Sequence, residues 1–124
     1  MSARWIAAGA AVVVLGAAGP AAACKCGVTS RDQAIASNPV VFEGRIVNIQ
    51  TTGKTQTTTM SIVRPIKGVS GGETLKVRSH TQSAACGYDF RKARSTLLVG
   101  GQGAGRGVVS VRRCTMYNLN PGQD

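Results

Sequence analysis

The fold of this chain depends first on residues 21–26, which read AAACKC. Cys24 and Cys26 follow three alanines directly, at the end of an apolar N-terminal stretch. Small residues of this kind are what a signal peptidase requires before its cleavage point. Cleavage after Ala23 would make Cys24 the first residue of the mature protein. Its α-amino group would then sit on a residue that a disulfide can hold in place.

The residues before Cys24 have the three parts of a secretory signal. Arg4 supplies the positive charge, residues 6–18 form the apolar region, and Gly19-Pro20 interrupts it. The apolar run is shorter than the roughly 20 residues that a membrane span needs. We therefore expect residues 1–23 to be a signal peptide, the protein to be secreted, and no transmembrane segment to remain after processing. A retained N-terminal anchor is the alternative.

The mature chain would be one small domain of about 100 residues, a size that usually benefits from cross-links. It holds all four cysteines, Cys24, Cys26, Cys86 and Cys114. An even number in a short exported chain implies two disulfides. A bridge between Cys24 and Cys26 would be strained, which leaves two long-range pairings open. Each bridge would close a loop of about 60 residues or more and stabilise the fold by roughly 4 kcal/mol. A Cys₄ zinc site competes with this interpretation, although the C-x-C spacing is unusual for zinc.

The chain is strongly basic, with a formal net charge of +10 that falls by one when Arg4 is removed with the signal. Such a charge favours acidic surfaces or anionic polysaccharide as partners, and it equally suits a protein that only needs to stay soluble. The basic cluster Arg91-Lys92-Ala93-Arg94 could contact nucleic acid. Binders of single strands also need aromatic platforms, however, and Phe42 is expected in the core. We therefore interpret the cluster as a solvated turn and expect no nucleic-acid partner.

Few residues are suited to catalysis. His80 is the only histidine and is expected in a polar loop over residues 79–83, while the acids are scattered along the chain. The cysteines are committed to the disulfides. The glycine-rich tract 101–107 is flanked by expected strands, whereas a dinucleotide loop needs a following helix. We expect a mobile hairpin loop over residues 100–107, no enzymatic activity and no cofactor.

The remaining pattern predicts a mainly β fold. Ser30 and Gln33 form a capping box that opens a helix through Ser37, which Asn38-Pro39 ends. The expected strands are Val40–Ile49, with a bulge at Gly44, and then Thr57–Val63, Glu73–Ser79, Thr96–Val99 and Val108–Arg112. Pro65 should end the second strand or mark an edge. Five strands with one short helix favour a small barrel that closes on itself, followed by a frayed tail over residues 118–124.

Several of these pieces occur in a recognisable order. They are Cys24-Lys25-Cys26, the segment 32–42, Ile66-Lys67-Gly68, the segment 83–87 around Cys86, and the segments 97–101 and 109–114. In this order the chain resembles the netrin-like (NTR) module, and within it the N-terminal domain of the tissue inhibitors of metalloproteinases. The resemblance spans about residues 24–117.

The resemblance implies a five-stranded OB-like barrel in which Cys24 pairs with Cys86 and Cys26 pairs with Cys114. It also implies a mechanism of inhibition. The α-amino nitrogen and carbonyl oxygen of Cys24 would bind the catalytic zinc of a metalloendopeptidase in trans, at the open position where that zinc holds water. An α-amine has a pKa near 8 and loses its proton to a metal at modest cost.

The same resemblance assigns a contact surface around Cys24. Lys25 would point toward the specificity pocket of the protease, with Cys26 next to it in the contact surface. The surrounding ridge would be formed by Gly27, Val28, Ala84, Ala85 and Cys86. The inhibitors commonly carry a small hydroxyl residue where this chain has Lys25. An ammonium group is costly to desolvate in an apolar pocket, so Lys25 suits an acidic one.

Two other functions compete with inhibition. Netrin-like modules also occur as extracellular adhesion or binding modules that have no inhibitory activity. If the resemblance is to these, the positive charge would serve to bind an acidic partner. In addition, Ala21-Ala22-Ala23-Cys24 weakly matches a bacterial lipoprotein signal, in which the cysteine is acylated on its sulfur and its amine. Acylation would anchor the protein at the cell surface, and it would exclude both the Cys24 disulfide and the chelating amine.

Overall fold

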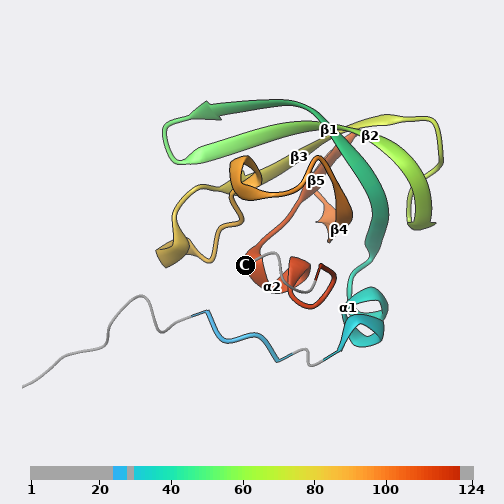
Figure 1. Ribbon diagram of the computed structural model, residues 1–124, viewed down its shortest axis with the longest axis horizontal. Coiled ribbons are helices and arrows are strands. Elements are labelled where there is room, and N and C mark those ends of the chain that lie inside the picture. The colour runs from blue at the N-terminus through green and yellow to red at the C-terminus, as the bar shows by residue number, and fades with distance from the viewer. Residues whose placement is uncertain (1–23, 28–29, 121–124) are drawn as a thin grey trace, which may run out of the picture.

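The computed structural model describes residues 24–27 and 30–120. The predicted signal peptide, Val28 of the predicted ridge and residues 121–124 of the predicted tail lie outside the described residues. Within the described part, five strands close into a barrel in the order β1-β2-β3-β5-β4. The β3–β5 pair is parallel and the other pairs are antiparallel (Figure 1). This confirms the predicted fold class, a mainly β, five-stranded OB-like barrel with a short N-terminal helix and two disulfides.

The elements follow one another along the chain with short connections. The helices are α1 (Arg31–Ser37) and α2 (Arg113–Met116), and two 3₁₀ turns are η3 (Ser83–Ala85) and η4 (Phe90–Lys92). The strands are β1 (Val40–Thr52), β2 (Thr55–Lys67), β3 (Thr74–His80), β4 (Thr96–Gly103) and β5 (Val108–Ser110).

The first helix forms as its local sequence predicts. The hydroxyl oxygen of Ser30 accepts a hydrogen bond from the Gln33 backbone N–H at 3.1 Å, which satisfies one of the free donors of the first turn. At the other end, the ammonium of Lys67 donates to the carbonyl oxygens of Ile35 and Ala36, at 3.2 and 2.9 Å. These carbonyls lie in the last turn of α1 and have no partner within the helix. Lys67, the last residue of β2, satisfies them and so holds the end of α1.

The predicted bulge at Gly44 is present and lets β1 bend around the core. The register with β2 shifts between Glu43 and Gly44. A Cβ at Gly44 would lie 2.8 Å from the ring of Phe42 and 2.9 Å from the terminal methyl of Met60. Phe42 and Met60 are both fully buried, so the missing side chain leaves room for the two largest groups under the bend.

Several predicted boundaries are wrong. Pro65 does not end β2, which runs on to Lys67. It faces Phe42 beside a register shift, where the irregular ladder tolerates a residue without an N–H. β4 continues past Val99 to Gly103, so Gly100 and Gly101 are buried strand residues rather than part of a mobile loop. β5 ends at Ser110, and the short helix α2 was not predicted.

The core fills the barrel from all five strands. Alternate residues of β2 and β3 point inward, as the predicted period of two requires. The main cluster consists of Val40, Phe42, Met60, Ile62, Leu75, Val77, Phe90, Leu97, Val99, Val109, Val111 and Met116. A smaller cluster of Ala34, Leu98 and Leu119 packs beneath α1.

The packed domain extends beyond the expected boundary at Tyr117. The side chain of Leu119 is 2% exposed. The Asn120 amide accepts from the Leu98 N–H at 2.9 Å and donates to the Leu98 carbonyl at 2.7 Å. Asn120 therefore satisfies both backbone groups of a β4 residue, and the frayed tail that we predicted does not begin at Asn118.

Candidate functional site

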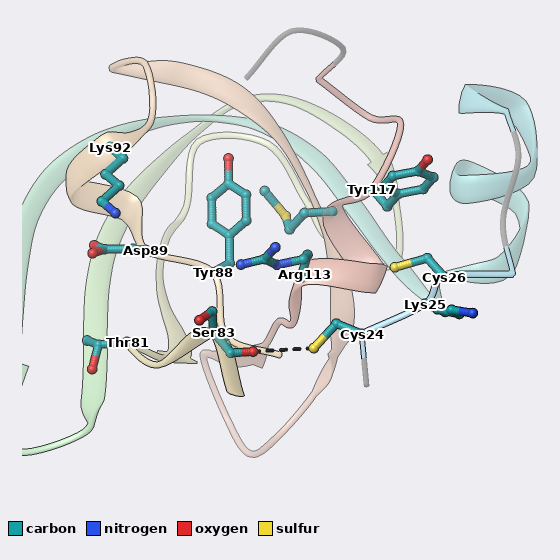
Figure 2. Close-up of a pocket in the computed structure, with 12 residues that line it drawn as sticks. Cys24, Lys25, Cys26, Thr81, Ser83, Tyr88, Asp89, Lys92, Arg113 and Tyr117 are labelled. Atoms are coloured by element: carbon teal, nitrogen blue, oxygen red, sulfur yellow. Dashed lines mark hydrogen bonds between the residues drawn. The ribbon is translucent and has the colours of Figure 1, made fainter. Parts of the chain in front are cut away.

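The N-terminal segment runs along the barrel in an irregular extended conformation. Cys24 and Cys26 are half-buried, whereas Lys25 between them and Gly27 after them are exposed. Figure 2 shows the Lys25 side chain directed away from the neighbouring cavity. Successive side chains of an extended chain point in opposite directions, so turning both cysteines toward the barrel presents Lys25 outward.

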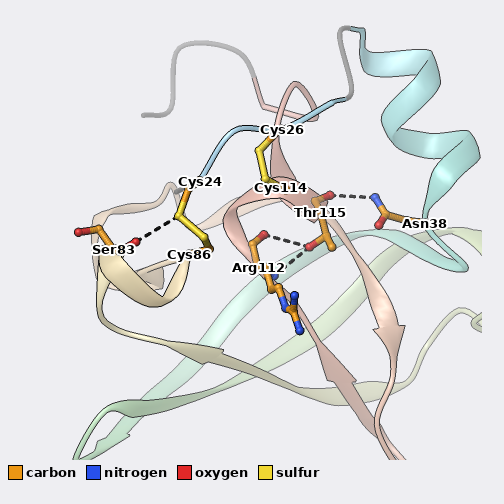
Figure 3. The surroundings of a disulfide bond; sticks show 8 residues. All are labelled: Cys24, Cys26, Asn38, Ser83, Cys86, Arg112, Cys114 and Thr115. Carbon is orange, nitrogen blue, oxygen red and sulfur yellow. Dashed lines mark hydrogen bonds between the residues drawn. A yellow bond between two sulfur atoms is a disulfide. The ribbon is translucent and has the colours of Figure 1, made fainter. Parts of the chain in front are cut away.

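Two disulfides fasten this segment to the barrel. Cys24 is bonded to Cys86, with their Cα atoms 5.5 Å apart, and Cys26 is bonded to Cys114, with their Cα atoms 5.1 Å apart (Figure 3). This is the pairing that the resemblance implied. It removes the competing zinc site, because a sulfur in a disulfide is no thiolate ligand. Across the described residues, no group of three or more His, Cys, Asp or Glu side chains is placed to hold a metal ion.

A hydrogen bond joins the two barrel segments that carry Cys86 and Cys114. The backbone N–H of Arg113 donates to the carbonyl of Cys86 at 2.8 Å, which joins the start of α2 to the loop that follows η3. The hydroxyl of Thr115 accepts from the Arg112 N–H at 2.9 Å and so caps the helix. The Thr115 carbonyl in turn accepts from the Asn38 amide at 2.8 Å (Figure 3). A helix this short is held by these tertiary bonds rather than by its own propensity.

Part of the predicted ridge lies against Cys24. Ala84 and Ala85 of η3 are exposed, and Cys86 after them adopts a left-handed conformation with φ of 56°. The Cys24 sulfur lies 3.3 Å from the carbonyl oxygen of Ser83. A disulfide sulfur carries no hydrogen, so we interpret this approach as a close nonbonded contact. The structure therefore brings Cys24, Lys25, Cys26, Ala84, Ala85 and Cys86 together; Gly27 is exposed just beyond them, and Val28 lies outside the described residues.

A cavity of about 700 Å³ opens beside this segment (Figure 2). Its walls come from the N-terminal segment, from the loop between β3 and β4, and from α2 with Tyr117. The lining residues are Cys24, Lys25, Cys26, Thr81, Ser83, Gly87, Tyr88, Asp89, Lys92, Arg113, Met116 and Tyr117.

A buried glutamine fixes the far wall of the cavity. The Gln56 carbonyl oxygen accepts from the Phe90 N–H at 2.7 Å, and its amide nitrogen donates to a carboxylate oxygen of Asp89 at 3.0 Å. Gln56 is fully buried inside the barrel. The ring of Tyr88 packs edge-on against Phe90, with their centroids 4.9 Å apart. The loop between β3 and β4 is therefore anchored from within the core.

The Asp89 carboxylate is committed to its neighbours. The Arg91 guanidinium donates to both of its oxygens, at 2.9 and 2.8 Å. These hydrogen bonds, and further ones from Gln56 and the Arg91 N–H, hold the pKa of Asp89 far below its usual range against the opposing effect of burial. The basic cluster at residues 91–94 is thus a solvated turn only in part. Arg91 pairs with Asp89 and Lys92 lines the cavity, while Arg94 is exposed.

His80 does not lie in a loop as predicted. It ends β3, opposite Thr55, and is exposed. Lys76, Arg78 and His80 alternate with buried residues and so line the outer face of that strand. Lys76 and Arg78 thus place two neighbouring basic residues on one exposed face of the barrel.

Neither the models of known protein families nor the curated proteins give a match to this sequence. In the part of the chain that the structure describes, no helix is both long and apolar enough to cross a membrane. The two disulfides are compatible with an extracellular protein.

Sequence reasoning missed the cavity and most of its lining. Tyr88, Arg113 and Met116 carry no motif, and they meet only because α2 packs against the loop between β3 and β4. One signal for α2 was available. Thr115 stands three residues after Arg112, the spacing at which a hydroxyl residue can bond back to the start of a helix.

Proposed function

We propose that this protein is a secreted netrin-like barrel that inhibits a zinc metalloendopeptidase through its mature N-terminus, Cys24. The observation that carries the proposal is the double tether of residues 24–26. Cys24 is bonded to Cys86 and Cys26 to Cys114, and the Cys86 carbonyl accepts from the Arg113 N–H at 2.8 Å. The first residue of the mature chain would thus be held by its own bridge to Cys86 and by the Cys26–Cys114 bridge two residues later.

The tether supplies what a backbone chelator needs. After cleavage the amino nitrogen and carbonyl oxygen of Cys24 form a two-atom clamp that can take the position of the attacking water on the target's zinc. A free chain end would have to be ordered when it binds, at about 1–2 kcal/mol for each residue. The disulfides have already removed much of this cost, so more of the interaction energy appears as affinity.

The residues around Cys24 suit contact with a cleft. Lys25 is exposed and directed away from the cavity (Figure 2), and the exposed Ala84 and Ala85 directly precede Cys86, the disulfide partner of Cys24. A long cation in a specificity pocket needs a carboxylate there, because an ammonium is expensive to desolvate without a partner. The proposed target is therefore a zinc protease with an acidic specificity pocket.

An adhesion or binding module for acidic partners is the second candidate. The exposed Lys76 and Arg78 on the outer face of β3 favour it, since neighbouring cations on one face attract polyanions. A lipid-anchored form of this module is less compatible with the disulfides. Acylation would need the Cys24 sulfur, which is bonded to Cys86.

The state of the N-terminus separates these functions. Intact mass and N-terminal sequencing of the exported protein should give an unmodified Cys24 as its first residue. An added diacylglyceride would establish the anchored form. A residual alanine would convert the α-amine of Cys24 into an amide and so rule out chelation by Cys24.

A direct test adds one alanine before Cys24 in the mature protein and measures inhibition constants on a panel of zinc proteases. The extension turns the amine into an amide but keeps both disulfides. Inhibition should weaken by about 100-fold or more, since even the loss of an outer-shell partner of a metal ligand costs 10–100-fold. Unchanged inhibition constants would refute chelation by Cys24.

A further inference from the structure

The cavity beside Cys24 has the dimensions of a ligand site. Its volume of about 700 Å³ lies within the range of about 300–1,000 Å³ that is typical of pockets for small ligands and side chains. Cys24 forms part of its wall. A partner that reaches the Cys24 backbone would therefore lie next to this cavity.

Two cations in the wall have no anionic partner. Lys92 and Arg113 are exposed, and across the described residues neither of them takes part in a salt bridge. Asp89 is the acid among the lining residues, but both of its oxygens are engaged by Arg91. Figure 2 shows the Arg113 side chain extending toward Tyr88. The cavity therefore has an excess of positive charge.

Three of the other lining residues are apolar or aromatic, while Thr81 and Ser83 add hydroxyl groups. Met116 is 3% exposed, and Tyr88 is half-buried and held edge-on by Phe90. Tyr117 at the rim is 39% exposed. A surface of this kind accepts an aliphatic stem that ends in an anion, because the stem packs on the tyrosine rings while the charge reaches the cations.

We propose that this cavity binds an acidic segment of the protein partner, with glutamate or aspartate side chains paired to Lys92 and Arg113. The inference deepens the proposed function and rests on it for the identity of the partner, a metalloprotease with carboxylates along the edge of its cleft. The volume exceeds that of one side chain, so the segment contributes neighbouring residues as well. The same partner must then present negative charge at two places, one that faces Lys25 and one that faces the cavity.

The test uses the mature disulfide-bonded domain and a defined probe, N-acetylated tetraglutamate amide. Backbone amide shifts are followed by NMR, with the tetraglutamine peptide as the neutral comparison. Tetraglutamate should shift the amides of Gly87, Tyr88 and Met116 in a saturable way, and tetraglutamine should not. The Lys92→Ala/Arg113→Ala variant should bind tetraglutamate at least 10-fold more weakly.

A matched control excludes a general effect of charge. The Lys76→Ala/Arg78→Ala variant removes the same charge from the outer face of β3 and should leave the shifts at the cavity unchanged. Equal weakening in both double variants, or shifts confined to β3, would overturn the inference. Glutarate binding as tightly as tetraglutamate would also overturn it, because the cavity would then be a site for a small dicarboxylate.

The same titration distinguishes this inference from the proposed function. The variant with one alanine before Cys24 keeps the cavity and should bind tetraglutamate with unchanged affinity while it loses inhibition. If no protease is inhibited by the parent protein but tetraglutamate binds, the chelation proposal fails alone. If inhibition is found but tetraglutamate does not bind, the acidic-segment inference fails alone.

Discussion

Replacing both Cys24 and Cys86 by serine separates the stability of the barrel from the position of its N-terminus. The change removes one bridge but keeps the amine and carbonyl of residue 24. Cys26–Cys114 remains and still ties the segment to α2. The expected loss can be worked out from the way the two bridges are nested.

The remaining bridge shortens the loop that the removed one closes. Cys24 and Cys86 are 62 residues apart along the chain. With Cys26–Cys114 intact, the shorter path runs through Cys26, across that bridge, and back from Cys114 to Cys86. This ring contains about 30 residues, so loop entropy gives a loss of about 3.5 kcal/mol. For a domain of this size that lowers the melting temperature by about 15–25 °C.

The matched control is Cys26→Ser/Cys114→Ser. Its cysteines are 88 residues apart, yet with Cys24–Cys86 intact it opens the same ring of about 30 residues. The two variants should therefore lose about equal stability, as measured by urea unfolding under non-reducing conditions. A difference of more than about 2 kcal/mol between them would show that loop entropy does not set the contribution of these bridges.

Inhibition should fall further than stability alone explains. In the folded Cys24→Ser/Cys86→Ser variant, two residues must be ordered when the clamp binds, which costs about 2–4 kcal/mol or about 30- to 1,000-fold in the inhibition constant. The assay is made at a temperature where unfolding data show the variant to be folded. Full potency there would refute the argument that the bridge positions the clamp.

Two further changes test packing and electrostatics. In Gly100→Ala the added Cβ would lie 2.5 Å from the Asn38 amide nitrogen, and we expect a loss of about 1–3 kcal/mol in urea unfolding. Gly103→Ala has nothing within 4 Å and should be nearly neutral, so equal losses would contradict this reasoning. Asp89 has a pKa below its ordinary value of 3.8 because of its hydrogen bonds to Arg91. A depressed folded pKa gives stability that is complete above about pH 5 and is lost as the pH falls further. Asp89→Asn should therefore flatten the acid dependence of the unfolding midpoint between about pH 5 and pH 2, and a slope like that of the parent would count against the Asp89–Arg91 pair.

Local patterns predicted most of the fold. Ser30 caps α1 through a contact three residues away, and the alternation in β3 follows from the period of a strand. Gly44 marks the bend because a side chain there would meet Phe42. In each case the interaction that decides the structure lies within a few residues of the signal.

The candidate site was predicted only in part. Cys24, Lys25 and Cys26 are adjacent in sequence, so their exposure alternates as an extended segment requires. The sequence assigns Lys92 to a solvated turn and Arg113 to no site, because nothing near them in the sequence shows that they share a cavity. Gly100 and Gly101 were assigned to a loop on composition, since the packing of α2 and Leu119 against β4 has no local signature.

The sequence by itself determined the number of strands, the helix cap, the bend at Gly44 and the expectation of two bridges, because each depends on neighbouring residues. Cysteine spacing left two pairings open, and the pairing that the resemblance implied is the one present in the folded chain. The end of β4, the helix α2 and the cationic cavity beside Cys24 emerge only in the tertiary structure. These features join residues that are tens of positions apart, and they exist only once the barrel has closed and brought its loops to one rim.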